Sequence, residues 1–153
     1  MSETKRISEQ LQSSFYKGAW HGPSVMEALD GVSAKQAATR SIPNAHTIWE
    51  LVLHTTTWIR EVNKMIAEMS YVQVPEDINF PNVTDESEAS WNKAVESLKR
   101  TYQKFEKHVA TLKDPALEKI PDNTSSTFYR LIHGVIQHNI YHAGQIVLLK
   151  KFK

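Results

Sequence analysis

The sequence predicts an all-α protein: a four-helix bundle with a long crossover connection between its first two long helices. Apolar residues recur every three or four positions over four long segments, the spacing of amphipathic helices. No segment shows the sustained period-two alternation of a strand. Three of the five glycines and all six prolines gather between the helical segments, where they mark breaks. Four such helices on 153 residues suit a bundle.

The first half of the chain is expected to hold two long helices and a short one. The first long helix is predicted over residues 3–19, with Ile7, Leu11 and Phe15 on one face. A short helix follows between Pro23 and Gly31, and the second long helix continues to about residue 71. The connection over residues 20–46 is long enough to cross the end of the bundle.

Capping signals mark the helix starts in this half. Three hydroxyl residues stand three positions before Glu or Gln, which is the spacing of the reciprocal capping box. The pairs are Ser24 with Glu27, Ser33 with Gln36, and Thr47 with Glu50. The last pair predicts that the second long helix begins directly behind Thr47.

The second half is expected to hold the other two long helices. Thr84 or Asp85 can cap the third, whose apolar stripe extends over residues 91–112. The fourth is predicted to begin near Ser125 or Ser126 and to run almost to the end of the chain.

Composition narrows the possible functions. We expect a single domain over residues 1–153, since 41% of the residues are hydrophobic and no disulfide or metal is needed to hold such a core. Cysteine is absent, which excludes thiolate zinc sites and thiol nucleophiles. The 18 basic and 17 acidic residues form no block, so nucleic acid is not an expected partner. Neither a signal sequence nor a membrane span is visible, and we expect a cytoplasmic protein without membrane association.

Three of the seven histidines form a candidate metal site. His138 and His142 are four residues apart on the apolar stripe of the last helix, about 40° apart around its axis. His54 lies at the edge of the buried face of the second long helix. If the two helices are neighbours, three imidazoles can bind one divalent ion and leave positions open for water or substrate. The alternative is that they are hydrogen-bonded core histidines.

The other histidines and other catalytic patterns fit less well. His133 points about 140° away from His138. His21, His46 and His108 are expected at the surface, in loops or on a charged helix. The chain has no HExxH motif, no paired Glu-x-x-His motifs of di-iron bundles and no G-x-S-x-G nucleophile elbow.

Two segments carry a resemblance to a known family. They are HNIYHAGQIVLLKK, which begins at His138, and SIPNAHTIWELVLHTTTW, which surrounds His54. With Trp20 and the PSVMEALDG turn, they resemble the DinB-like or YfiT-like family of small four-helix bundles. The family's single histidine and H-x-x-x-H pair fall on His54, His138 and His142. The chain departs from the family at His46, where relatives often carry Trp.

The resemblance implies a divalent metal site, with nickel or zinc as the expected ion and manganese or iron as further options. It also implies a homodimer. Relatives of known activity are metal-dependent thiol transferases and isomerases that use low-molecular-weight thiols. The leading hypothesis is therefore a metal-dependent thiol S-transferase or hydrolase, with Tyr141, Asn139 and Gln145 as possible contacts of the ligands or substrate. The alternative is a non-catalytic bundle that binds a metal or ligand in a stress response.

Overall fold

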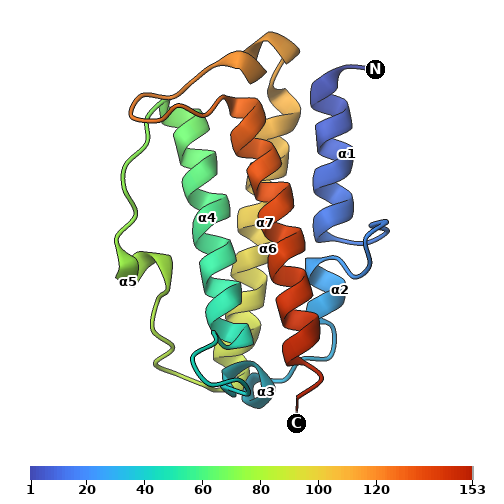
Figure 1. The fold of residues 1–153 in the computed structure, drawn as a ribbon, viewed down its shortest axis with the longest axis vertical. Helices are drawn as coiled ribbons and strands as arrows, with labels where there is room; N and C mark the ends of the chain where they lie inside the picture. The colour runs from blue at the N-terminus through green and yellow to red at the C-terminus, as the bar shows by residue number, and fades with distance from the viewer. Residues whose placement is uncertain (153) are drawn as a thin grey trace.

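The structure, a computed structural model, describes residues 1–152, and it is all helical. Within that range no strand forms, and an isolated bridge joins the loops at Ser70 and Asp122. The four long helices stand side by side along the long axis of the molecule (Figure 1). They are α1 (Glu3–Phe15), α4 (Ile48–Glu68), α6 (Glu88–Thr111) and α7 (Phe128–Leu149). The predicted all-α four-helix bundle is therefore confirmed.

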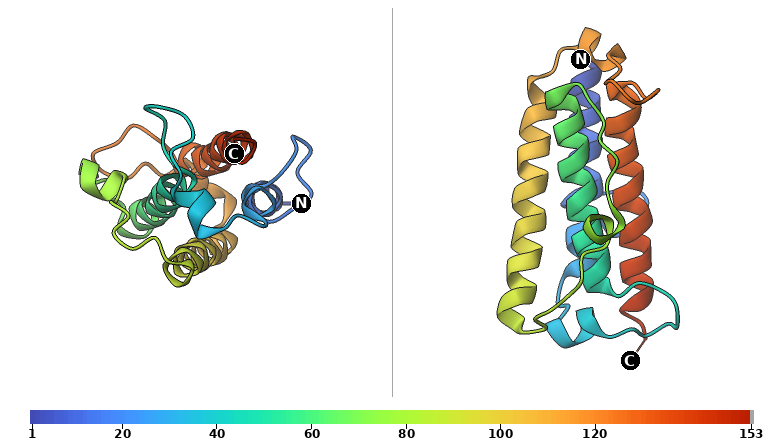
Figure 2. Two further views of the ribbon diagram at one scale, coloured as in Figure 1. Left: turned by 90° about the horizontal axis from the view of Figure 1, so that it is seen from below. Right: turned by 90° about the vertical axis from the view of Figure 1, so that its left-hand side faces the viewer.

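Each long helix borders two others. Helix α4 packs against α6 and α7, and α1 packs against the same two helices, so the four axes occupy the corners of a square (Figure 2). Helices α1 and α7 run in one direction along the bundle, whereas α4 and α6 run in the other (Figure 1). Helices α4 and α7 are thus antiparallel neighbours, which is the arrangement that the predicted three-histidine site requires.

The connection between α1 and α4 is long and passes beneath one end of the bundle, a path that its predicted length allows (Figure 1). Helix α1 has 13 residues and α7 has 22, lengths of about 20 and 33 Å at 1.5 Å per residue. The short helix α2 (Val25–Leu29) continues the column below α1 and packs on α7. Helix α3 (Ala34–Ala38) then leads across the base to α4.

The segment that returns along the length of the bundle is residues 69–87, here called the crossover segment. Because α4 and α6 are parallel, the chain must travel from the end of α4 back to the level of its start (Figure 2). The crossover segment carries the short helix α5 (Glu76–Asn79), which packs on α4. No sequence pattern predicted that this second connection returns along the bundle.

The capping predictions hold best in the first half. Ser24 and Thr47 form complete capping boxes with Glu27 and Glu50, while at Ser33 the hydroxyl accepts the predicted backbone hydrogen bond. Helix α1 ends at Phe15 and not near residue 19, because Gly18 follows with a left-handed φ of 78°.

In the second half the helices start later than predicted. Helix α6 is capped by Ser87, whose hydroxyl accepts from the Ser90 N–H, while Asp85 accepts from the Ser87 N–H. Thr84 does not cap the helix. Helix α7 is capped by Thr127 and not by Ser125 or Ser126. Residues 84–87 offer three possible caps and residues 124–127 offer four, and the choice among them depends on how the loop approaches the bundle.

The core follows the bundle axis. Trp49 and Trp91 are buried with ring centroids 5.2 Å apart, and the Trp91 indole N–H donates to the Val32 carbonyl. Between α1 and α6, Phe15 stacks on Tyr102. Among residues 1–152, every helix is too short or too polar to cross a lipid bilayer.

Candidate metal centre

Three histidines converge between α4 and α7. The Nε2 atoms of His54 and His138 lie 3.0 Å apart, and those of His138 and His142 lie 2.9 Å apart. One ring nitrogen from each of the three lies within 4.8 Å of the others. His54 comes from the middle of α4, and the other two lie one turn apart on α7, so the helical phase argument placed them correctly.

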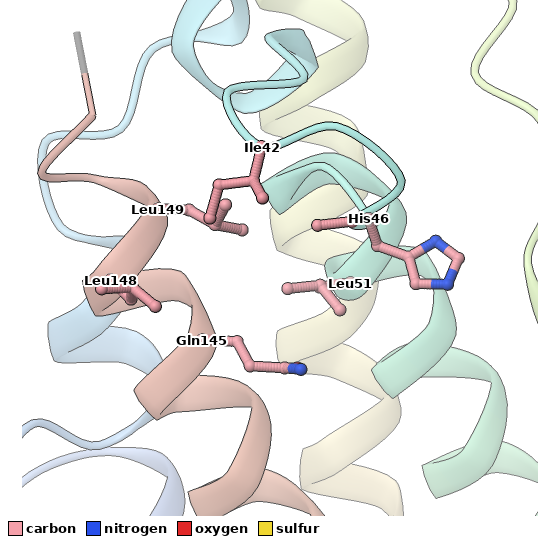
Figure 3. A pocket seen from close by; sticks show the side chains of 7 residues that line it. Ile42, His46, Leu51, Gln145, Leu148 and Leu149 are labelled. Carbon is pink, nitrogen blue, oxygen red and sulfur yellow. The ribbon is translucent and has the colours of Figure 1, made fainter.

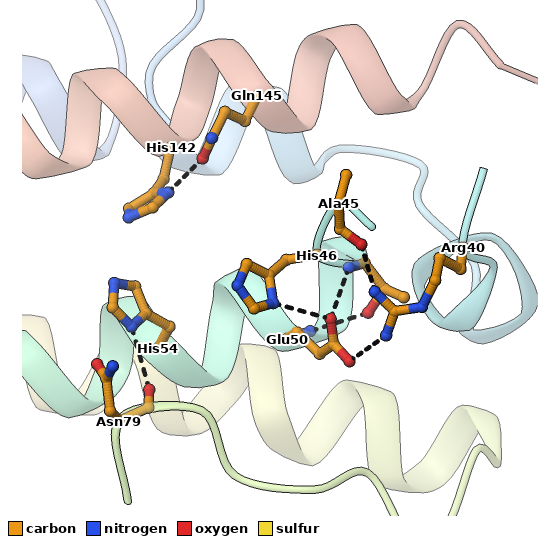
Figure 4. A network of polar contacts seen from close by, with 9 residues as sticks. Arg40, Ala45, His46, Glu50, His54, Asn79, His142 and Gln145 are labelled. Atoms are coloured by element: carbon orange, nitrogen blue, oxygen red, sulfur yellow. Dashed lines mark hydrogen bonds and ion pairs between the residues drawn. The ribbon is translucent and has the colours of Figure 1, made fainter. Parts of the chain in front are cut away.

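Hydrogen bonds at the outer nitrogens orient two of these rings. Nδ1–H of His54 donates to the carbonyl oxygen of Asn79 at 3.0 Å, and Nδ1–H of His142 donates to Oε1 of Gln145 at 2.5 Å (Figure 4). Because these oxygens can only accept, Nδ1 carries the proton in both rings. The lone pair of each Nε2 is therefore directed into the cluster, which is how metal-ligating histidines are normally held.

The surroundings keep the cluster uncharged. Burial and the two neighbouring imidazoles lower the pKa of His138 to about 3. Burial, with the charge of His54 and His46 adding to it, lowers the pKa of His142 to about 4. Burial also lowers the pKa of His54. All three rings are thus neutral near pH 7, the form that binds a metal ion.

The donor set fits a divalent cation. His138 Nε2 can carry at most one hydrogen, yet it faces the lone pairs of both His54 and His142. A cation would satisfy all three lone pairs at once. Two nitrogens about 2.0–2.1 Å from one tetrahedral zinc ion lie about 3.4 Å apart, so small outward shifts of the rings would suffice. Imidazole ligands suit zinc, nickel, iron and copper.

The crossover segment completes the site, and sequence reasoning missed this. Its residue Phe80 stacks on His54 with ring centroids 4.1 Å apart and an interplanar angle of 5°. The indole N–H of Trp58 donates to Oδ1 of Asn79 at 2.9 Å, and the Thr57 hydroxyl donates to the Ile78 carbonyl at 3.1 Å. Trp58 therefore anchors this segment to α4. Residues 78–80 have no periodic pattern of apolar residues, so their contact with α4 is visible only in the structure.

A polar network adjoins the cluster at the start of α4. His46 stacks on the other face of Phe80 and its Nδ1 lies 3.1 Å from Glu50 Oε2. Glu50 also accepts from the Arg40 guanidinium at 2.6 Å (Figure 4). His46 is half exposed, as expected for a surface histidine, but its contacts with Phe80 and Glu50 were not predicted. The i, i+4 spacing of His46 and Glu50 was the sequence pattern that could have predicted the contact between them.

The three residues expected to contact the ligands or substrate differ in their surroundings. Gln145 contacts His142 directly. Tyr141 is largely exposed, with its ring centroid 5.1 Å from that of His142. Asn139 is completely buried, and within residues 1–152 neither polar atom of its amide has a hydrogen-bond partner.

The remaining histidines lie away from the cluster, as predicted. His133 packs against the ring of Tyr129, and His108 Nδ1 lies 2.7 Å from Asn63 Oδ1. His21 is exposed in the connection between α1 and α2.

Two cavities flank the cluster along α7. The first, of about 260 Å³, is lined by His138, Trp58, Arg130 and apolar side chains of α4 and α7. The second, of about 200 Å³, lies toward the C-terminal end of α7 and is lined mainly by aliphatic side chains, with His46 and Gln145 on its wall (Figure 3). The first cavity thus reaches the cluster at His138, whereas the second is lined by its neighbours Gln145 and His46 and by none of the three histidines.

Comparison with known proteins supports the resemblance seen in the sequence. No curated protein and no solved structure matches the chain. The family model described as the DinB superfamily matches residues 20–146. That span includes His54, His138 and His142, together with the whole of α4, the crossover segment and α6. The chain belongs to the DinB superfamily.

Proposed function

We propose that this protein is a metal-dependent enzyme that activates a low-molecular-weight thiol at an ion held by Nε2 of His54, His138 and His142. The observation that carries the proposal is the convergence of three neutral imidazoles, two of them oriented by outer hydrogen bonds. Nickel or zinc is the proposed ion, with manganese or iron as further options.

The chemistry follows from the residues around the cluster. A bound divalent ion lowers the pKa of a thiol or water molecule beside it. Asn79 and Gln145 hold two of the imidazoles in the tautomer that binds metal, and Phe80 covers one face of His54. Because the chain contains no cysteine, the sulfur nucleophile must come from a cosubstrate.

The two cavities suit a reaction of two substrates. The cavity beside His138 combines apolar walls with the guanidinium of Arg130, which can pair with the carboxylates that small biological thiols carry. The aliphatic cavity beside Gln145 suits the apolar part of an electrophile. Transfer of the thiol to this electrophile makes the enzyme an S-transferase. With water in place of the thiol, the same site would act as a hydrolase.

The test is a turnover assay on protein reconstituted with zinc, nickel or manganese. Monochlorobimane is the electrophile and a panel of low-molecular-weight thiols supplies the nucleophile. We expect turnover with at least one thiol, its loss in His142→Ala, and its retention in the matched control His133→Gln. Chelator should abolish turnover but leave a cooperative thermal melt, because the apolar core does not depend on the ion.

Metal binding without turnover over the whole panel would contradict the enzyme proposal. It would favour the alternative, a non-catalytic bundle that binds a metal or ligand.

A further inference from the structure

A fourth imidazole stands beside the three-histidine cluster. The Phe80 ring lies 3.8 Å from that of His46 and 4.1 Å from that of His54, nearly parallel to both. One aromatic ring therefore separates His46 from the cluster. In Figure 4, Nε2 of His46 lies on the side of the ring that faces His54 and His142.

The carboxylate of Glu50 orients this imidazole. Nδ1–H of His46 donates to Oε2 of Glu50 at 3.1 Å, and the same oxygen accepts from the Thr47 backbone N–H at 2.9 Å. The other carboxylate oxygen accepts from Arg40 at 2.6 Å. With Nδ1 held as the donor, Nε2 of His46 keeps a free lone pair. An imidazole oriented by a carboxylate in this way is the usual form of a histidine general base.

We propose that His46 is the acid–base residue of the thiol reaction and that Glu50 is its positioning residue. This inference rests on the proposed function. The S–H bond of the thiol breaks, the proton forms a new bond to Nε2 of His46, and the electron pair stays on sulfur. Sulfur then bonds to carbon of the electrophile while the bond from that carbon to the leaving group breaks and its electron pair departs with that group. Glu50 stabilises the imidazolium through Nδ1–H. The proton then passes from Nε2 to the leaving group or to solvent.

The surroundings favour His46 over the cluster histidines for this task. The Nε2 lone pairs of the cluster are directed at the proposed ion, so they are not free to accept a proton. His46 is 48% exposed at its side chain, which allows its proton to exchange with solvent. The ionisable groups that surround it are Arg40 in the loop after α3, Glu50 in the first turn of α4, His54 farther along that helix, and His142 on α7.

Substitution of His46 by Phe tests the proposal, because Phe retains an aromatic ring against Phe80 but cannot carry the proton. In zinc-loaded protein we expect kcat/KM for the best thiol to fall about 10²- to 10⁴-fold, with zinc affinity unchanged. The rising limb of the pH profile should disappear or move. Glu50→Gln should show a smaller fall. His21→Phe, at an exposed loop histidine, is the matched control and should behave as wild type.

A second measurement does not depend on turnover. Calorimetric titration of zinc-loaded protein with the thiol alone, in buffers of different ionisation heat, counts the protons released on binding. Wild type and His21→Phe should release fewer protons than His46→Phe, by up to one per thiol, since His46 retains the proton.

The outcomes separate this inference from the proposed function. Equal proton release and equal turnover in wild type and His46→Phe would overturn the role of His46 and leave the enzyme proposal standing. Reduced proton release in wild type without turnover of any electrophile would support His46 as the proton acceptor and contradict the enzyme proposal.

Discussion

The two sides of this bundle fill their interior with different chemistry. Between α1 and α6, Phe15 and Tyr102 stack at 3.7 Å, and the Tyr102 hydroxyl donates to the Leu11 carbonyl at 2.6 Å. Between α4 and α7, the corresponding space holds His54, His138 and His142, and Asn139 lies buried nearby on α7.

The difference lies in how the buried polar atoms are satisfied. On the α1 and α6 side, the hydroxyls of Tyr102 and Ser14 both donate to the Leu11 carbonyl oxygen. On the α4 and α7 side, the Nε2 lone pairs face one another, and neither polar atom of Asn139 has a partner within residues 1–152. An unsatisfied buried polar group costs about 1–3 kcal/mol. The first side therefore satisfies its buried polar atoms within the protein, whereas the second leaves several of them without a partner.

The largest expected effect on stability lies on the α1 and α6 side. Phe105 is completely buried on α6, so Phe105→Ala should lower the free energy of unfolding by about 3–5 kcal/mol. Urea denaturation measures it, with the exposed Tyr129→Ala as control. Zinc affinity of the folded variant should stay at the wild-type value. A large loss of zinc affinity would mean that the two sides are not independent.

The largest effect on metal binding should lie on the other side. Replacing His54, His138 or His142 by Asn or Gln removes one nitrogen ligand and should weaken zinc binding at least about 100-fold, because even outer contacts of ligands contribute 10- to 100-fold. Titration calorimetry measures the affinity. His133→Gln and His108→Gln are the controls and should change it little. Equal losses at His133 and His138 would show that helical phase selected the wrong ligands.

The sequence predicted most of the fold because the signals for single helices are local. The hydroxyl of Thr47 and the carboxylate of Glu50 stand three residues apart and cap α4 as their spacing predicts. The first residue of the last helix was harder to predict, because its cap, Thr127, lies in a run of four hydroxyl residues that begins at Thr124. The local sequence does not show which of these four residues caps the helix.

The candidate site was predictable only where it lies on helices. The spacing of His138 and His142 and the phase of His54 were sufficient to bring the three together. Asn79 and Phe80 escaped prediction because they reach His54 through the crossover segment, whose path depends on α4 and α6 being parallel. That relation is a property of the whole bundle, and no short sequence pattern carries it.

The two sides should also respond differently to acid. The cluster histidines are neutral in the folded protein, with pKa values of about 3 for His138 and 4 for His142, whereas in the unfolded chain histidine titrates near 6.5. The unfolded state therefore binds more protons between these limits, and the unfolding free energy of the metal-free protein should fall as pH drops below about 6.5.

Urea denaturation in chelator at pH 7 and pH 5 measures this decline. His138→Leu should show a shallower decline than wild type, while the exposed His21→Leu should match wild type. Zinc affinity should hold to lower pH than the value near 6 expected for unperturbed histidines, since burial already suppresses protonation of the free site. Identical declines in wild type and His138→Leu would contradict the neutral buried cluster.

The smallest expected effect concerns Asn139. Its amide is completely buried without a partner, so Asn139→Leu should remove an unsatisfied polar group while nearly conserving volume. We expect the unfolding free energy of the metal-free protein to rise by about 1 kcal/mol, with an unchanged dependence on urea. Asn139→Ala is the matched control and should destabilise, because it leaves a cavity. A loss of stability in both variants would show that a buried water satisfies the amide. The α4 and α7 side would then hold one fewer unsatisfied group, and its contrast with the α1 and α6 side would rest on its histidines, the three of the cluster and His133, whose buried Nε2 also has no partner within residues 1–152.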